Sequence, residues 1–172
     1  MSKPDQIINR VQQSGLITID IAEYYHKGEV VGYDIVQNLF QGLVLKEKDF
    51  RAFIADNDWS VYKNKNVYIH CSNEAIIPTW AYMLIMISID EFAENVVVGS
   101  RESMQQHLSD LAIQKINFDH FLDTRVVIKG CSDHEIPAYA YGKLSQKLKP
   151  IVKSLMFGEP CSTVPLYKRK KV

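Results

Sequence analysis

Three cysteines carry the chemistry that this sequence offers. Cys71, Cys131 and Cys161 are each followed directly by serine and, a few residues later, by proline. An odd number of cysteines with no signal-peptide pattern favours a reducing, cytoplasmic setting, where thiols are free or bind metal. Thiolates are ligands of zinc and of iron–sulfur clusters, and an activated thiolate is a nucleophile. The cysteines therefore predict a thiolate site.

Two of the cysteines lie in near-copies of one segment. Residues 67–82 and 126–141 both read as an apolar strand, Cys-Ser, a polar loop, proline and the start of a helix. In a parallel sheet, Cys71 and Cys131 would follow the carboxyl ends of strands, where such sheets bind ligands. The helix N-termini beyond them favour thiolates. If the strands of the two copies are neighbours, a pseudo-two-fold axis would bring Cys71 and Cys131 to one edge of the sheet. Cys161 could then reach the same edge from the C-terminal tail.

The expected roles follow from these positions. The predicted metal ligands are Cys71, Cys131, Cys161 and His134, and the predicted bound group is an iron–sulfur cluster or zinc. Gly130 permits a tight turn before Cys131, so we expect Cys131 to be the most reactive thiol. If the site is catalytic, Cys131 is the nucleophile and His134 or Glu135 the acid or base. The alternative is that each cysteine is a small buried hydrophobe.

The elements that must position these residues predict an α/β fold. Within residues 61–157 strands alternate with helices, which is typical of a parallel sheet with right-handed crossovers. We predict three layers and one mostly parallel sheet built from repeated strand-loop-helix units. The expected strands are 67–70, 95–98 and 125–129, and the expected helices are 78–90, 100–115 and 137–148.

The two ends of the chain flank this repeat region. Residues 1–60 are predicted to hold a helix at 4–13, an antiparallel strand pair at 16–21 and 30–35, and a helix at 46–56. Residues 158–172 are predicted to be an irregular tail. A length of 172 residues is that of a single domain, and we expect one domain over residues 1–172.

Composition excludes several function classes. The chain is 47% apolar and 23% charged with a net charge of zero, as in an ordinary soluble protein, so we expect no nucleic-acid or membrane partner. The basic run 168–171 reads as a solvated chain end. The sequence contains no dinucleotide-binding, Walker or nucleophile-elbow motif, and no arginine completes a phosphate loop after Cys71 or Cys131.

Four segments resemble a bacterial family known only as domain of unknown function 2480. They are residues 40–51, 77–84, 126–133 and 153–168, of which the last is the most specific. The resemblance covers nearly the whole chain and brings no activity with it. It implies a setting, because such proteins tend to be encoded beside sulfur-mobilisation genes that assemble iron–sulfur clusters. Iron–sulfur assembly proteins are therefore the expected partners, and a homodimer is compatible with the sequence.

The leading hypothesis is an accessory protein of iron–sulfur or sulfur metabolism that uses the three thiols to bind a metal, a cluster or sulfur. A structural zinc or iron site without chemistry is the first alternative. The second is an interaction module with buried cysteines that docks a partner through residues 153–172. A small-molecule pocket at the strand ends is the third, and whether the chain is an enzyme stays open.

Overall fold

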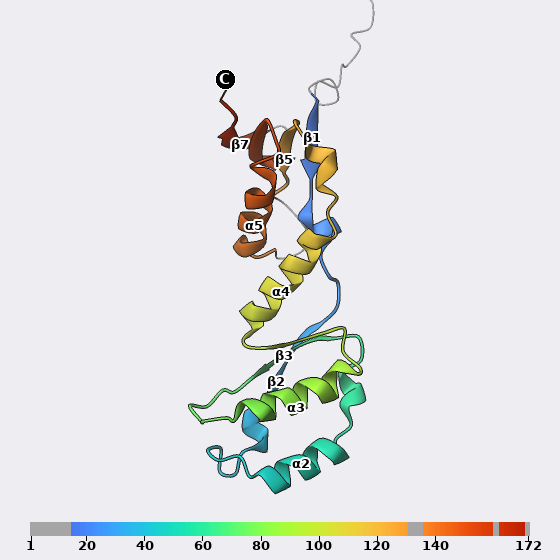
Figure 1. Ribbon diagram of the computed structural model, residues 1–172, viewed down its shortest axis with the longest axis vertical. Helices are drawn as coiled ribbons and strands as arrows, with labels where there is room; N and C mark the ends of the chain where they lie inside the picture. Colours follow the sequence, from blue (N-terminus) through green and yellow to red (C-terminus); the bar gives the residue numbers. More distant parts are fainter. Residues whose placement is uncertain (1–14, 131–135, 160–161, 171–172) are drawn as a thin grey trace, which may run out of the picture. The chain divides into compact units, whose positions relative to one another are not determined.

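The computed structural model describes residues 15–130, 136–159 and 162–170, which form two compact units (Figure 1). The central unit is His26–Leu108, and the terminal unit combines the segment ending at Tyr25 with Ser109–Val172. Each unit has its own sheet and its own core. The mixed α/β class is therefore confirmed, but two sheets replace the one expected. The single domain over residues 1–172 stays a prediction.

The central unit is built on a parallel sheet with the strand order β2-β3-β4. The strands are β2 (Val30–Asp34), β3 (Asn66–His70) and β4 (Asn95–Val98), and the helices are α2 (Glu47–Asp56), α3 (Thr79–Asp90) and the start of α4 (Arg101–Gln114). Helix α3 packs against β3 and β4, and α2 packs against α3. The core between them includes the buried side chains of Phe50, Trp59, Ile69, Ile85 and Ile89.

The terminal unit has a four-stranded sheet with the order β1-β5-β6-β7. Its strands are β1 (Leu16–Ile19), β5 (Arg125–Ile128), β6 (Ser154–Glu159) and β7 (Ser162–Lys168), and its helix is α5 (Ala138–Leu148). The first three strands are parallel, and β7 is antiparallel to β6. The buried side chains of Val126, Ile128, Leu144, Leu148 and Leu155 belong to one core that joins α5 to the sheet.

A large part of each unit has the same structure, so the chain contains a structural repeat. Residues 58–99 and 117–158 contain the same succession of 3-10 turn, strand, helix and strand. The offset is constant at 59, the difference in number between the helix caps Pro78 and Pro137, so no residue is inserted or deleted between the copies. The sequence repeat that included the cysteines is therefore part of a longer structural repeat.

Matching backbone details support this alignment. Asn64 and its counterpart Asp123 both adopt positive φ, 59° and 55° respectively, a region that Asn and Asp tolerate better than most residues. The Asn64 N–H donates to the Phe92 carbonyl at 3.1 Å, and the Asp123 N–H donates to the Ile151 carbonyl at 2.8 Å. The turn before each repeated strand is thus fixed in the same way in both units.

Each repeat takes its remaining parallel strand from the N-terminal part of the chain. Strand β1 pairs with β5, and β2 pairs with β3. The antiparallel pairing predicted for 16–21 with 30–35 is therefore wrong. Asp20 and Asp34 each cap a 3-10 turn directly after the strand, accepting the N–H of Ala22 at 2.9 Å and of Val36 at 3.1 Å. The turn at Asp20 ends β1, and both strands then pair with strands that come later in the chain.

The predicted irregular tail at 158–172 is also wrong over its described part. Residues 154–159 and 162–168 form the hairpin strands β6 and β7. Pro165 lies within β7 although it lacks the N–H that an interior strand needs. It is tolerated because β7 is an outer strand and because Pro165 faces Met156 beside a register shift.

The other expected elements are confirmed to within about two residues at each end, which is the usual uncertainty of a boundary. The helix expected at 4–13 lies outside the described residues. Within the part of the chain that the structure describes, no helix is both long and apolar enough to span a bilayer.

The repeat predicts matched costs of core truncation. Ile85 and its counterpart Leu144 are both fully buried in the cores of their own units. Each change to alanine should lower the free energy of unfolding by ~2–5 kcal/mol, because it removes apolar contacts and leaves a cavity. Denaturant unfolding followed by amide hydrogen exchange measures the cost and shows which unit is affected.

The control is Met83→Ala, since the Met83 side chain is 57% exposed on the same helix as Ile85. A cost for Met83→Ala equal to that for Ile85→Ala would contradict the assigned core. Loss of exchange protection that is spread evenly over both units, in Ile85→Ala and in Leu144→Ala, would also contradict the assigned core.

Candidate functional site at the carboxyl ends of the strands

The predicted site residues divide between the two units. Cys71 follows β3 in the central unit and is described. In the sequence, Cys131, His134 and Glu135 come between β5 and α5, and Cys161 comes between β6 and β7; all four are outside the described residues. The side chains and backbone groups that border these positions are described, and they define the chemistry of each sheet edge.

Cys71 is a half-buried free thiol that packs against the core of the central unit. The neighbouring strand β2 ends at Asp34, directly opposite His70. Asp34 Oδ1 accepts the Ser72 N–H at 3.1 Å, which ties the segment after Cys71 to the end of β2. The His70 ring lies 5.3 Å from the Tyr68 ring, between centroids. Cys71 is therefore held in place by packing and by its neighbour's hydrogen bond.

Two ionisable groups beside Cys71 have shifted pKa values. Burial pushes the pKa of the Asp34 carboxyl upward, but hydrogen bonds from Ser72 and from the Val36 N–H, with the nearby His70, bring it below its ordinary value. The pKa of the Tyr82 phenol is raised, first by burial and then by the negative charges of Cys71 and Asp34. At neutral pH this edge therefore places the Asp34 carboxylate and a neutral Tyr82 phenol beside Cys71.

These groups do not make a metal centre by themselves. Among residues 15–130, 136–159 and 162–170, no three His, Cys, Asp or Glu side chains are arranged to hold a metal ion. Cys71 with Asp34 and His70 is included in that finding. The predicted metal set that also contains Cys131, Cys161 and His134 stays a prediction.

The corresponding edge of the terminal unit has a different polar arrangement. Asp20 ends β1 as Asp34 ends β2, but Asp20 Oδ2 pairs with the ammonium of Lys129 at 3.1 Å. This pairing with Asp20 raises the pKa of Lys129 above its ordinary value. A fixed positive charge therefore lies two positions before Cys131 in the sequence.

Two glycines border the undescribed cysteines, and backbone geometry requires the second of them. A Cβ on Gly130 would lie 2.7 Å from the Phe157 ring, closer than real Cβ contacts. Gly158 has φ of +122°, and a Cβ there would lie 2.6 Å from the Ser162 carbonyl oxygen. The chain therefore passes close to the end of β6 just before Cys131, and it turns tightly at Gly158, three residues before Cys161.

Glu159 is a candidate site residue that the sequence pattern did not indicate. Within the described part of the chain, its Oε1 is a buried side-chain oxygen without a hydrogen-bond partner. Burying such an oxygen unpaired costs free energy unless a ligand or another group satisfies it. The sequence signal was weak, because a glutamate before proline reads as an ordinary turn residue.

The structural repeat changes the comparison of the cysteines. With the constant offset, Cys71 corresponds to Gly130, and Cys131 corresponds to Ser72. The two Cys-Ser pairs are thus displaced by one residue relative to the strands. Strands β3 and β5 also belong to different sheets, so the neighbouring strands that would bring Cys71 and Cys131 to one edge are not formed. By contrast, β5 and β6 are direct neighbours.

A family model supplies the remaining context. The model described as "Protein of unknown function (DUF2480)" matches residues 5–169. The chain belongs to this family. No curated protein and no solved structure gives a match to the chain. The family name assigns no reaction, so the evidence on function comes from the groups at the sheet edges.

The Asp34 contacts predict a pH-dependent stability. Asp34→Ala removes the cap of the 3-10 turn and the tie to Ser72, and it should lower the free energy of unfolding by about 1 kcal/mol at neutral pH. Because the folded-state pKa of Asp34 is lowered, this contribution is present above the unfolded-state pKa of about 3.9. It is lost as the pH falls through the folded-state value.

Urea unfolding of wild type and Asp34→Ala at pH 7 and pH 3 measures the difference. Asp56→Ala is the control, because Asp56 is the last residue of α2, where a negative charge is unfavourable. A difference between Asp34→Ala and wild type that does not shrink at pH 3 would contradict the assignment of the carboxylate.

Proposed function

We propose that this chain is an accessory protein of sulfur or iron–sulfur metabolism whose working groups are the thiols of Cys131 and Cys161. The observation that carries the proposal is the parallel pairing of β5 with β6, in which Ile128 lies opposite Phe157. The segments that follow two paired parallel strands leave the sheet at the same edge, with starting points about 4.8 Å apart. This edge is where open parallel sheets bind ligands.

The sequence distances support a shared site. Cys131 directly follows Gly130, and Cys161 is two residues beyond Glu159. Cys131 is therefore three residues beyond Ile128, the end of β5, and Cys161 is two residues beyond the end of β6. A link this short keeps both thiols near the strand ends, because an extended residue spans only about 3.4 Å.

One described feature of this edge favours the reactive form of the thiols. The N-terminus of α5, where Pro137 supplies no side-chain cap, favours a negative charge, whereas the positive charge of Lys129 is already paired with Asp20. A thiolate in such surroundings binds soft metals and attacks sulfur. As an acceptor of sulfur from a persulfide donor, the Cys131 thiolate would become a persulfide and the donor would become a thiol.

The proposed cargo is therefore an iron–sulfur cluster, a zinc ion or a sulfur atom. Two thiolates leave a tetrahedral ion short of ligands, and His134 would supply a further one. The buried Oε1 of Glu159 fits such a site, since it needs a partner that the described residues do not supply. Cys71 follows a strand of the other sheet and is not part of the proposed site.

Binding to a protein partner is the second candidate function, and strand β7 favours it. β7 is an outer strand, and its Val164 and Leu166 side chains are 61% and 51% exposed. An exposed apolar edge strand is a template for pairing with another chain. In this alternative the cysteines are structural, as the packing of Cys71 against its core illustrates.

The test is the metal and acid-labile sulfide content of protein purified without oxygen, together with its visible spectrum. Wild type should carry a stoichiometric metal or cluster, or a sulfur atom that cyanide releases. Cys131→Ala and Cys161→Ala should each lose most of it, because each removes one of two thiolate ligands. Cys71→Ala is the matched control and should retain it.

Circular dichroism of all three variants separates loss of the ligand from loss of the fold. Wild type without metal, sulfide or labile sulfur, and with inert thiols, would contradict the proposal and leave the partner-binding alternative. Equal loss in Cys71→Ala would contradict the two-thiol site in favour of the three-cysteine one. Zinc whose chelation unfolds the protein would make the site structural.

A further inference from the structure

The opposite end of the terminal sheet carries a cationic pocket that the thiol proposal does not use. The pocket has a volume of about 350 Å³ and lies where β5 and β6 begin and β7 ends. Five of its seven lining side chains are Arg125, Lys153, Lys168, Arg169 and Lys170. The sequence pattern alone indicates a solvated chain end at residues 168–171, but the fold brings residues 168–170 beside Arg125 of β5 and Lys153, the residue before β6.

The single carboxylate in the pocket is already neutralised. Asp123 pairs with the Lys153 ammonium at 3.0 Å and with the Arg169 guanidinium at 2.9 Å. Arg169 also donates to the Ile151 carbonyl oxygen at 3.1 Å. The hydrogen bond from Lys153 and the two positive charges lower the pKa of Asp123, so it stays ionised. The pocket therefore keeps a net positive charge that Asp123 does not offset.

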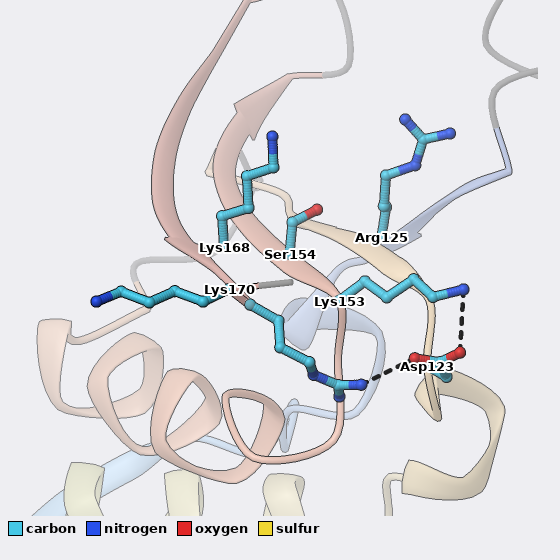
Figure 2. Close-up of a pocket in the computed structure, with 7 residues that line it drawn as sticks. Asp123, Arg125, Lys153, Ser154, Lys168 and Lys170 are labelled. Atoms are coloured by element: carbon cyan, nitrogen blue, oxygen red, sulfur yellow. Dashed lines mark hydrogen bonds and ion pairs between the residues drawn. The ribbon is translucent and has the colours of Figure 1, made fainter. Parts of the chain in front are cut away.

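The strand register builds a row of side chains across the sheet. Leu16 lies opposite Arg125, Arg125 opposite Ser154, and Ser154 opposite Lys168. Residues paired in register point to the same face of a sheet. Figure 2 shows Ser154 between Arg125 and Lys168, with both basic side chains directed to the same side. The row offers a guanidinium, a hydroxyl and an ammonium to one ligand.

An apolar surface continues from this row. A second pocket of about 410 Å³ shares Arg125, Ser154 and Lys168 with the first. Its further lining residues are Leu16, Met156, Pro165 and Tyr167. A ligand here would thus place an anionic group among the cations and an apolar body over the sheet face. The two volumes are in the range of small-molecule sites, about 300–1,000 Å³.

The central unit provides an internal comparison, because its matching edge is closed. The counterparts of Arg125 and Ser154 are Asn66 and Asn95, and the Asn95 amide donates to Asn66 Oδ1 at 2.8 Å. The Asn66 amide in turn donates to the Gly28 carbonyl oxygen at 3.2 Å, and Asn66 is fully buried. The central sheet also ends at β4, with no strand corresponding to β7. Of these two matching edges, the one in the terminal unit carries the cationic row.

We propose that this pocket binds a small organic phosphate, with the phosphate held by Arg125, Ser154 and Lys168 and the apolar part over Met156 and Pro165. The planar guanidinium of arginine matches phosphate oxygens in a bidentate manner, and lysine adds a point charge. The hydroxyl of Ser154 donates a further hydrogen bond. The site lies at the amino ends of the strands, so it is independent of the thiol proposal.

The experiment is calorimetric titration of the full chain with phenyl phosphate at physiological ionic strength. Binding should be saturable with one site, tighter than for inorganic phosphate, and undetectable for phenol. Lys168→Gln and Arg125→Gln should each weaken binding about tenfold, because each removes a hydrogen bond to a charged group. Lys115→Gln, an exposed lysine in the same unit, is the charge-matched control and should bind as wild type does.

Lys168 is exposed, so its variant should fold even if Arg125→Gln does not. Absence of saturable binding, or equal weakening in Lys115→Gln, would overturn the proposal. Binding of a single-stranded oligonucleotide without binding of phenyl phosphate would also overturn it, because the pocket would then belong to a polymer surface. Unchanged affinity in Cys131→Ala is expected, since the thiols lie at the other edge.

Discussion

The parallel register of β5 against β6 is the constraint on which the terminal unit depends. It places Ile128 opposite Phe157 at one end and Arg125 opposite Ser154 at the other. At the carboxyl end it aligns the two strands that precede Cys131 and Cys161 in the sequence, and at the amino end a guanidinium and a hydroxyl join one row. A slip of one residue would reverse the face of every side chain on the strand. The same slip would disturb both edges.

The structural repeat explains how one architecture supports two different units. Both copies retain the capped 3-10 turn, the left-handed residue before the strand and the proline before the helix. They differ in polar side chains at the strand ends. The central unit ties Asp34 to Ser72 and buries the Asn66–Asn95 pair, whereas the terminal unit ties Asp20 to Lys129 and exposes Arg125. The two units therefore differ in the charged groups at both ends of their parallel strands.

Local patterns in the sequence predicted most elements, because apolar runs and proline caps act over a few residues. The runs around Val67 and Val126 and the prolines at 78 and 137 identified the repeated strand and helix. The partners of β1 and β2 were missed because parallel pairing is nonlocal, with β1 joining a strand more than a hundred residues later. Strand β7 was also missed; it contains Pro165, and whether a strand tolerates proline depends on whether it lies at the edge of a sheet.

The candidate sites were predictable only in part, for the same reason. The cysteines could be found by residue type, but aligning Cys71 with Cys131 was misleading, because the strand register matches Cys71 with Gly130. The burial of Glu159 and the row from Arg125 to Lys168 arise from contacts between strands. No local pattern records such contacts, so only the folded sheet reveals these groups.

The most direct measurement is cross-linking of the reduced protein with dibromobimane, a short reagent that joins two nearby thiols, followed by peptide mass spectrometry. The account predicts one bridged peptide pair, Cys131 with Cys161, and single modification of Cys71. A bridge that contains Cys71 would contradict the assignment of the working thiols to one sheet edge. Single modification of all three cysteines would show that the edge does not bring Cys131 and Cys161 together.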